Sequence, residues 1–444
     1  AYNSSSERFS WLYACDACTG VILFICLFVL LLGGLPIAAC IGGATLIAFI
    51  VSGLPMMNFA SKVYSSINSF TLMAIPFFMF AGSLMANGGM SRRLIRFASS
   101  LVGWVTGGLV HVMILASAFF AALSGSAPAT CAAIGGMMIP EMKKKGFPAE
   151  FSAGVQCVAG TIGPIIPPSI PMVVYAVSAG ESVGEMFAGG VIPGIIYAAM
   201  LMVVSAIICK KKGFGEESKV KFDSHEVWLA FKDSIWALLV PIIILGGIYS
   251  GIFTPTEAGA VASAYGLFAG TFIYKELNFK EIGKLLIDTA ANSSLVLLII
   301  GCAGAFTWFL NMQGITASIG AWFAAVSSSK FIFMALTILL LLFMGCFMEC
   351  CASVLMITPV LLPVATSLGI DPVYFGVIVC MTLSLGMATP PVGEDLYIAA
   401  TIAGIKFEQE VKYVMPLVLA AIIAILICTA VPGIVMFLPG LFFG

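Results

Sequence analysis

The chain has 444 residues, of which 61% are hydrophobic and only 9% are charged. A soluble domain carries roughly 25% charged residues, so this composition cannot cover a water-facing surface. The formal net charge of −1 excludes a nucleic-acid-binding protein. Apolar stretches such as residues 20–33 and 186–209 approach the ~20 residues that cross a hydrocarbon layer. We therefore predict an all-α integral membrane protein whose surroundings are the lipid bilayer.

The N-terminal residues 1–18 show no signal peptide, because they lack a basic stretch and a small-residue cleavage site. We expect them to form a periplasmic segment. The 13 cysteines are scattered mostly through apolar stretches, which is typical of small buried hydrophobes. Cys15 and Cys18 form one CxxC pair, and since no second pair accompanies it, we do not interpret it as a zinc site or a disulfide.

Basic residues set the predicted topology. Seventeen of the 20 Lys and Arg fall into five clusters. Positive charge stays on the cytoplasmic side of a membrane, so all five clusters should lie on one side. The chain must therefore leave and return between each pair of neighbouring clusters, which occupy residues 92–96, 143–145, 210–232, 275–284 and 406–412.

Along the first half, we predict a helical pair at 19–34 and 36–53, a crossing at 70–87 and an amphipathic surface helix at 91–104. A re-entrant helical hairpin at 108–140 follows, with the break Ser-Gly-Ser-Ala-Pro at its tip. The next predicted elements are a crossing at 149–177 broken by Gly-Thr-Ile-Gly-Pro-Ile-Ile-Pro-Pro-Ser at 160–169, a return at 185–209, and connecting crossings at 234–250, 255–274 and 292–312.

The second half repeats this order upside down. At an offset of 223, Gly163 matches Gly386, Pro140 matches Pro363, and the pair at 167–168 matches that at 390–391. The charge map places the first hairpin inside and the second outside, so we predict inverted repeats, with about ten crossings and both termini periplasmic. The second-half elements are a surface helix at 315–329, a hairpin at 331–363 broken at 345–353, a crossing at 372–402 broken at 386–393, and a last helix at 416–438.

The predicted domain organisation follows this repeat. Residues 1–18 are the N-terminal segment, residues 19–233 hold the first helix and the first repeat, and residues 234–444 hold a connecting helix and the second repeat. Inverted repeats with paired broken helices are typical of secondary transporters that bind their solute at the membrane midplane.

The breaks are the candidate site. A backbone polar group left unpaired in hydrocarbon costs several kcal/mol, so a break inside a crossing should line an ion-filled or wet site. Freed carbonyls supply oxygen ligands for Na⁺, and hydroxyls supply the remainder. Glu349 is a carboxylate inside the membrane and is functional by default, although a hairpin tip in water would also hold it. The candidate Na⁺ ligands are Ser124, Ser126, Thr130, Thr161 and Gly163 in the first half, and Glu349, Ser353, Thr382, Gly386 and Thr389 in the second.

The solute-binding residues are predicted from the absence of basic residues in two long stretches. No Lys or Arg lies between Lys145 and Lys210 or between Lys330 and Lys406. If the solute is an anion, helix N-termini and bound cations must meet its charge. Ser169, which opens the helix after the Pro-Pro pair, is the leading candidate, and an ordinary N-cap role for it stays open. The other candidates are Thr161, Pro168 and Pro391.

Four spaced motifs occur in order along the chain: the break at 160–169, Gly-Gly-Val-Ile-Pro-Gly at 189–194, Gly-Ile-Phe-Thr-Pro-Thr-Glu-Ala-Gly at 251–259, and Gly-Ile-Asp-Pro at 369–372 with Thr-Pro-Pro-Val-Gly at 389–393. Together they resemble the large membrane subunit of tripartite ATP-independent periplasmic (TRAP) transporters. The resemblance covers residues 34–443. One departure is Glu394-Asp395, where smaller or apolar residues are expected.

The resemblance implies a protein of the bacterial inner membrane that imports an organic acid, such as sialic acid or a C4-dicarboxylate, with Na⁺ by an elevator mechanism. It implies two partners: a small (Q-type) membrane subunit, separate or fused upstream, and a periplasmic substrate-binding protein. The residues that match the ion-site motifs of the family are Ser124, Ser126, Thr161, Gly163, Glu349, Gly386 and Thr389.

Two other functions stay open. One is a related elevator carrier that takes dicarboxylates without a binding protein. The other is an integral-membrane enzyme that uses Glu349, Glu394 and Asp395 as acids and bases. The chain has only two histidines, His111 and His225, and no metal-binding constellation supports the enzyme. The sequence does not identify the acid that is carried.

Overall fold

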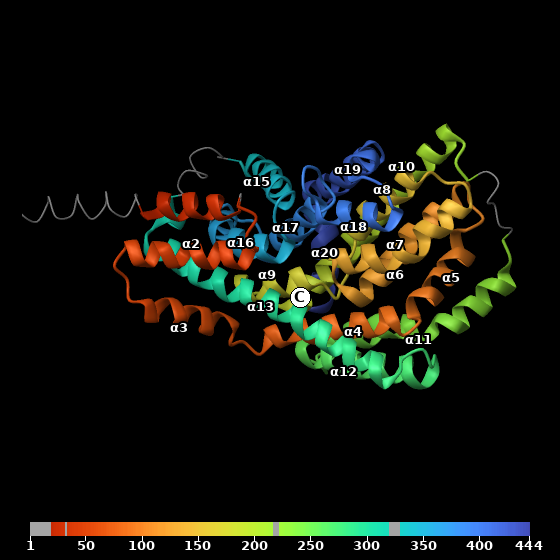
Figure 1. The fold of residues 1–444 in the computed structure, drawn as a ribbon, viewed down its shortest axis with the longest axis horizontal. Helices are drawn as coiled ribbons and strands as arrows, with labels where there is room; N and C mark the ends of the chain where they lie inside the picture. The colour runs from red at the N-terminus through yellow and green to blue at the C-terminus, as the bar shows by residue number, and fades with distance from the viewer. Residues whose placement is uncertain (1–18, 32, 216–221, 319–328) are drawn as a thin grey trace, which may run out of the picture.

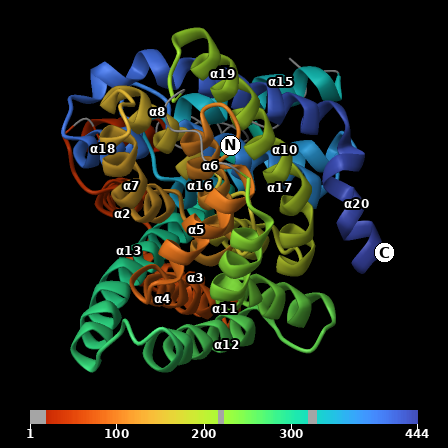
Figure 2. The same cartoon turned by 90° about the vertical axis from the view of Figure 1, so that its right-hand side faces the viewer.

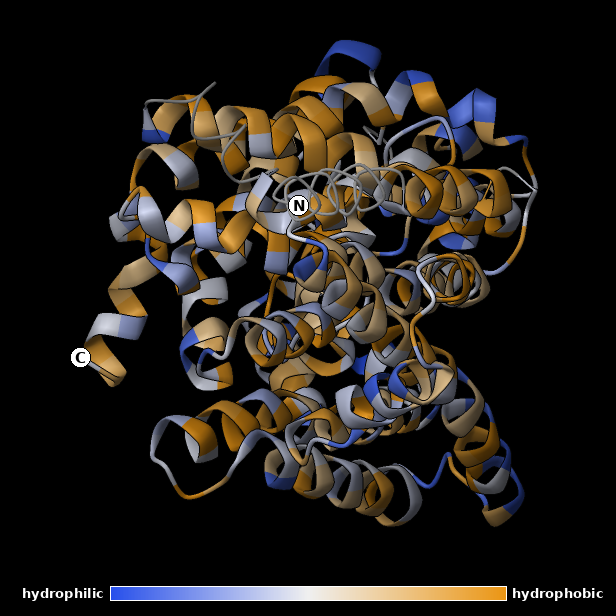
Figure 3. Ribbon diagram, turned by 90° about the vertical axis from the view of Figure 1, so that its left-hand side faces the viewer, coloured by the Kyte–Doolittle hydropathy of each residue, from blue (hydrophilic) through white to orange (hydrophobic). Residues whose placement is uncertain are grey.

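The computed structural model describes residues 19–31, 33–215, 222–318 and 329–444, and in this part the chain is helical and without strands (Figure 1). Five helices are long and apolar enough to cross a membrane, and a sixth span arises if one bent pair counts as one. Hydrophobic residues run along most of the helices (Figure 3). The all-α membrane class predicted from composition is therefore confirmed. The expectation for residues 1–18 lies outside the described residues.

The first helices pack against one long later helix. Helix Thr19–Leu31 and α2 (Ile37–Val51) are the predicted pair. A further helix, α3 (Met56–Ile67), was not predicted; none of its residues is buried, and it precedes α4 (Ala74–Asn87) across a bend of 64°. Both α2 and α3 contact α13 (Phe279–Met312).

The predicted surface helix is α5 (Met90–Val102), and arginines fasten it to its neighbours. Arg93 pairs with Asp233 of α11 (Ser224–Tyr249) at 3.3 Å and with Glu276 at 2.9 Å. Its guanidinium also lies 3.8 Å from the centre of the Tyr274 ring. Arg93, a member of the first basic cluster, therefore links α5 to α11 and to the segment that contains Tyr274 and Glu276.

Helices form on both sides of each break predicted in the first half. Helices α6 (Gly108–Ser124) and α7 (Ala127–Lys144) are antiparallel neighbours joined by Gly125 and Ser126. Gly125 has φ +63, a conformation that favours glycine. Helices α8 (Ala149–Gly160) and α9 (Ile170–Ala179) flank the predicted break, and α10 (Val183–Lys212) is the return crossing.

Two connecting helices begin earlier than predicted because capping residues lie upstream of their apolar stretches. The α11 helix starts at Ser224 rather than 234, with the Asp223 side chain accepting from the His225 amide, so the proposed domain boundary at 233/234 falls inside a helix. The α13 helix starts at Phe279 rather than 292, behind a capping box of Asn278 and Glu281. Between them, α12 (Pro255–Phe268) continues as the π-helix Ala269–Ile273.

The second half has the predicted order with shifted ends. Helix α16 starts at Cys350, inside the predicted break, so the hairpin break is shorter than predicted, and the helix continues beyond Pro363 to Ser367. The predicted last helix is two helices, divided at Val431, and the first of them starts at Phe407 instead of 416. Most of the predicted surface helix at 315–329 lies outside the described residues. The elements are α15 (Lys330–Gly345), α16 (Cys350–Ser367), α17 (Pro372–Gly386), α18 (Glu394–Ala403), α19 (Phe407–Ala430) and α20 (Pro432–Phe442).

Helix starts in the two halves follow the same offset as the matched glycines and prolines. The α16 helix begins 223 residues after α7, and α17 begins 223 residues after α8. The α18 and α19 helices begin 224 residues after α9 and α10. The sequence repeat is therefore also a repeat of helix boundaries.

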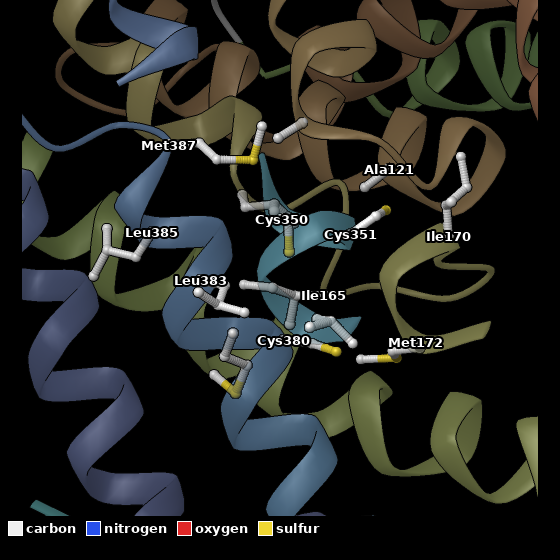
Figure 4. Close-up of a cluster of buried hydrophobic side chains, with 14 of the residues drawn as sticks. Ala121, Ile165, Ile170, Met172, Cys350, Cys351, Cys380, Leu383, Leu385 and Met387 are labelled. Carbon is white, nitrogen blue, oxygen red and sulfur yellow. The ribbon is translucent and has the colours of Figure 1, made fainter. Parts of the chain in front are cut away.

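The helices gather into two groups (Figures 1 and 2). One group, here the outer layer, is α2–α4 with α11–α13; α12 packs on α4, and α13 packs on α2, α3 and α4. The other, here the hairpin layer, is α6–α9 with α15–α18; α18 packs on α7 and α8, and α16 packs on α9 and α17. Buried apolar side chains join the two halves inside the hairpin layer (Figure 4), among them Ile165, Ile170, Met172, Cys350, Cys380 and Leu383.

Candidate functional site

The tip of the first hairpin is a small network of hydroxyls. The Thr130 hydroxyl donates to the Ser126 carbonyl oxygen at 2.8 Å. Since a hydroxyl has one hydrogen, the 2.8 Å contact between Ser124 and Thr130 has Ser124 as the donor. Ser126 is the N-cap residue of α7, but its side chain makes no capping hydrogen bond. Three predicted ligand residues are thus adjacent, with the Ser126 hydroxyl uncommitted to the helix.

The first break lies directly on this tip. A Cβ at Gly163 would collide with the Ser126 carbonyl and come within 2.9 Å of the Thr130 hydroxyl oxygen. The Ile170 amide, which opens α9, donates to the Gly125 carbonyl at 3.2 Å. Only glycine allows this approach, so residue 163 brings the break and the hairpin tip together.

The second half joins its break to its own hairpin tip in the same way. A Cβ at Gly345 would lie 2.8 Å from the Gly386 α-carbon, so the two backbones touch. The Gly393 amide donates to the Cys346 carbonyl at 3.1 Å, and Gly393 is the offset equivalent of Ile170. Glu349 is the N-cap of α16, where its Oε2 accepts from the Ala352 amide at 3.0 Å. The Pro-Pro bonds of both breaks are cis.

A cavity of about 810 Å³ lies between the outer layer and the hairpin layer. Helices α4 and α13 form one wall, the first hairpin forms another, and the second half contributes Glu349 and Glu394. Those two carboxylates are the only charged groups among the described residues that line it. Its polar lining also includes Ser83, Asn87, Ser124, Ser126, Thr289 and Asn292.

The structure divides the predicted ligands into two sets. Ser124, Ser126 and Glu349 line the cavity. Gly163, Gly386 and Thr389 lie at the breaks outside its lining, and the Thr389 hydroxyl donates to the Leu385 carbonyl at 2.9 Å. A Na⁺ site at the tip of either hairpin stays a prediction.

The predicted solute ligands lie outside the cavity lining. The Thr161 hydroxyl donates to the Val158 carbonyl and accepts from the Tyr197 hydroxyl, both at 2.7 Å. Ser169 is buried and caps α9, donating to the Pro164 carbonyl at 2.5 Å and accepting from the Met172 amide at 3.3 Å. The N-cap role left open for Ser169 is therefore the one that this structure shows.

The two proline candidates occupy different surroundings. The Pro168 carbonyl oxygen would lie 2.5 Å from a Cβ at Gly125, so it faces the first hairpin tip. Pro391 is exposed. Neither lines the cavity. Their assignment to solute binding stays a prediction.

The cavity wall formed by α4 and α13 of the outer layer was not predicted from the sequence. Ser83 and Asn87 are four residues apart on α4, and Thr289 and Asn292 are three apart on α13, so each pair shares a helix face. Polar pairs at helical spacing inside apolar segments are a readable signal. The spacing does not show that these faces of α4 and α13 both lie against the first hairpin.

The unexpected pair Glu394-Asp395 points in two directions. Glu394 lines the cavity, whereas Asp395 is fully buried, with one carboxylate oxygen 3.0 Å from a Cβ placed at Gly160. Neither carboxylate oxygen of Asp395 has a hydrogen-bond partner among the described residues. Among the described residues, no group of three or more His, Cys, Asp or Glu side chains could hold a metal ion. A cation bound beside Glu394 or Asp395 would therefore need hydroxyl and carbonyl oxygens as well.

Comparisons with known proteins identify a matching family and a similar fold. The family described as "Tripartite ATP-independent periplasmic transporter, DctM component" matches residues 24–434. The fold also resembles the YdaH transporter of Alcanivorax borkumensis, with a TM-score of 0.58, 14% identity, and coverage of 85% of this chain and 88% of that one.

Similar curated proteins are permeases. The isethionate TRAP transporter permease protein DctMQ of Oleidesulfovibrio alaskensis is 41% identical over 94% of this chain, which spans 66% of that protein's length. The C4-dicarboxylate large permease DctM of Rhodobacter capsulatus is 37% identical, covering 95% and 99% of the two chains. The sialic acid large permease SiaM of Vibrio cholerae is 37% identical, covering 94% and 97%. The chain belongs to the family of DctM components, the large permeases of TRAP transporters.

Proposed function

We propose that this large permease, a multi-pass protein of the inner membrane, couples the import of an organic acid to Na⁺. The observation that carries the proposal is the cavity between the two layers. Both hairpin tips reach it, and its described lining has two carboxylates and no basic residue. An acidic solute in such a cavity needs bound cations beside it.

The first hairpin tip is the first proposed Na⁺ site. Ser124, Ser126 and Thr130 concentrate hydroxyl and carbonyl oxygens there, and the backbone around Gly163 adds further carbonyls. Such oxygens are the ligands that Na⁺ takes at unwound transporter helices. Thr161 is a weaker candidate, since its hydroxyl already bonds Val158 and Tyr197.

The second hairpin tip, at Glu349, is the other proposed Na⁺ site. The backbone around Gly386 and Thr389, in the second break, would supply further carbonyl oxygens. A bound cation would balance the charge of the Glu349 carboxylate in a cavity that has no basic residue in its described lining. The matched helix boundaries of the two halves support a pair of equivalent sites.

We further propose that the hairpin layer moves as a unit against the outer layer, which is the elevator mechanism. The cavity lies at the border between the layers, so such motion would carry a bound solute past α4 and α13. The inverted orientation of the two repeats, with the first hairpin reaching in from the cytoplasm, would make the outward and inward states alike.

The partners follow from the family. A tripartite transporter has a periplasmic binding protein and a small membrane subunit, and the DctMQ relative is longer than this chain. The named relatives carry isethionate, C4-dicarboxylates or sialic acid, so the proposed solute is an organic acid.

Uptake into proteoliposomes that contain the permease and its small subunit tests the proposal. Uptake of the cognate acid should require an inward Na⁺ gradient and the binding protein, and ATP should have no effect. Equal uptake from K⁺ buffer would contradict Na⁺ coupling. Full uptake without the binding protein would favour the carrier that takes its solute directly.

A further inference from the structure

Glu394 lines the cavity from the first turn of α18. Its backbone is held on both sides, because the Gly393 amide donates to the Cys346 carbonyl at 3.1 Å and the Asp395 amide donates to the Met387 carbonyl at 3.0 Å. The N-cap of α18 is Gly393, which has no side chain, so Glu394 follows directly as the first helical residue. It forms no ion pair within the described part of the chain, where the four salt bridges all involve Arg93 or Arg96.

The cavity already has a carboxylate for a cation. Glu349 sits on the second hairpin tip, where the proposed function places Na⁺, and it accepts a hydrogen bond from the Ala352 amide. Glu394 is therefore a second negative group in the same cavity, and no Lys, Arg or His is present among the described lining residues to oppose it. Like charges that share one cavity repel each other.

The opposite polarity comes from the first hairpin. Ser126, Pro128 and Ala129 line the cavity at the start of α7, and the Ser126 side chain leaves the first turn uncapped. A helix N-terminus of this kind attracts a negative group. Ser126 and Ser124 bring hydroxyls to the same wall. The start of α7, together with the Na⁺ proposed beside it, therefore suits the acidic group of a solute. Glu394 suits a hydrogen-bond donor of the same solute.

We propose that Glu394 is a specificity-determining residue, and that the solute is an organic acid that also carries a hydroxyl or ammonium group for Glu394 to accept. A dicarboxylate of the same length would place a second negative group against Glu394 and is disfavoured. This inference rests on the proposed function, because it assumes that the cavity holds the transported acid.

Two matched sets of acids test it. Succinate, γ-hydroxybutyrate and γ-aminobutyrate share a carbon chain and one carboxylate and differ at the other end. Sulfoacetate, isethionate and taurine do the same with a sulfonate. Binding to the purified permease with its small subunit, in saturating Na⁺, is followed by ligand-induced thermal stabilisation, so the specificity of the binding protein does not enter. In at least one set, the hydroxy or amino acid should bind roughly tenfold or more tightly than the diacid.

The variant Glu394→Gln keeps the size of the side chain and removes its charge. It should reduce the preference to below about threefold, mainly by tightening the diacid, because the repulsion is lost. The matched control is Glu408→Gln, which changes an exposed carboxylate outside the cavity and should leave the preference unchanged.

The outcomes separate this inference from the proposed function. Diacids that bind as well as the hydroxy and amino acids, a preference that survives in Glu394→Gln, or no binding by any hydroxy or amino acid of the two sets would overturn the role of Glu394. Binding that is equal in K⁺ and Na⁺ would contradict Na⁺ coupling while leaving the preference for a donor group to be read from the same data.

Discussion

At the scale of single residues, the informative groups are those whose side chains are not consumed by local structure. Ser169 and Thr161 use their hydroxyls within or beside their own segment. Glu349 also caps a helix, yet it lines the cavity. All three were predicted as ligands because each lies at a break. That position does not determine which way the side chain points. From the residues alone, Glu349 and Glu394 stand out as charges in an apolar region, and the family resemblance adds that Glu349 matches an ion-site motif whereas Glu394 departs from the expected pattern.

The substitution Glu349→Gln tests the cation at the second hairpin tip. It keeps size and most hydrogen bonding but removes the charge that a bound Na⁺ would balance. The Na⁺ concentration for half-maximal uptake should rise roughly tenfold or more, which is about 1.4 kcal/mol. Membrane insertion and pairing with the small subunit should persist, and Glu408→Gln is the control. A wild-type Na⁺ activation curve would show that Glu349 is solvated rather than paired with a cation.

At the scale of elements, the order of hairpins and broken helices was readable because glycines and prolines leave few alternatives inside an apolar stretch. Helix ends were less readable. Caps at Asp223 and Asn278 extended α11 and α13 beyond their apolar cores. Helix α3 was missed because its polar residues, including Asn58 and Lys62, obscured it between two apolar segments. It packs against α13, a contact that composition does not reveal.

The contact between the first break and its hairpin leads to a second prediction. In Gly163→Ala, the added methyl would meet the Ser126 carbonyl and the Thr130 hydroxyl, so the tip must shift. Overpacking of this kind costs about 1–3 kcal/mol. The midpoint of thermal unfolding in detergent should fall, and the Na⁺ requirement for uptake should rise. In the control Gly283→Ala, the methyl meets nothing within 4 Å, so the unfolding midpoint should not fall and the Na⁺ requirement should not rise. An unchanged Gly163→Ala protein would show that the break and the tip are not in contact.

At the scale of the whole molecule, the sequence predicted the repeat but not the cavity. The offset of 223 can be read from residues in one dimension, and the helix starts follow it. The cavity wall on α4 and α13 depends on how the outer layer packs against the first hairpin, and no spacing along the chain encodes that contact. Whether the two layers move against each other is therefore the question that a three-dimensional experiment must answer.

A disulfide across the border of the two layers tests that motion. A Cβ at Gly82 of α4 would lie 3.6 Å from the Ser124 Cβ on the first hairpin, within the range that a disulfide spans. In a background without other cysteines, oxidised Gly82→Cys/Ser124→Cys should lose most Na⁺-driven uptake and regain it on reduction. Comparing both redox states of one protein removes the effect of losing the Ser124 hydroxyl.

The matched control joins two helices of the outer layer. A Cβ at Gly42 of α2 would also lie 3.6 Å from the Cβ of Cys302 on α13, so Gly42→Cys with native Cys302 forms the same kind of bond within one layer. If the hairpin layer slides past α4, only the disulfide between layers should stop transport. If both disulfides leave uptake intact, α4 and the first hairpin stay together throughout the cycle, and the moving part must be sought elsewhere. Loss of uptake with both would mean that the outer layer itself must change shape.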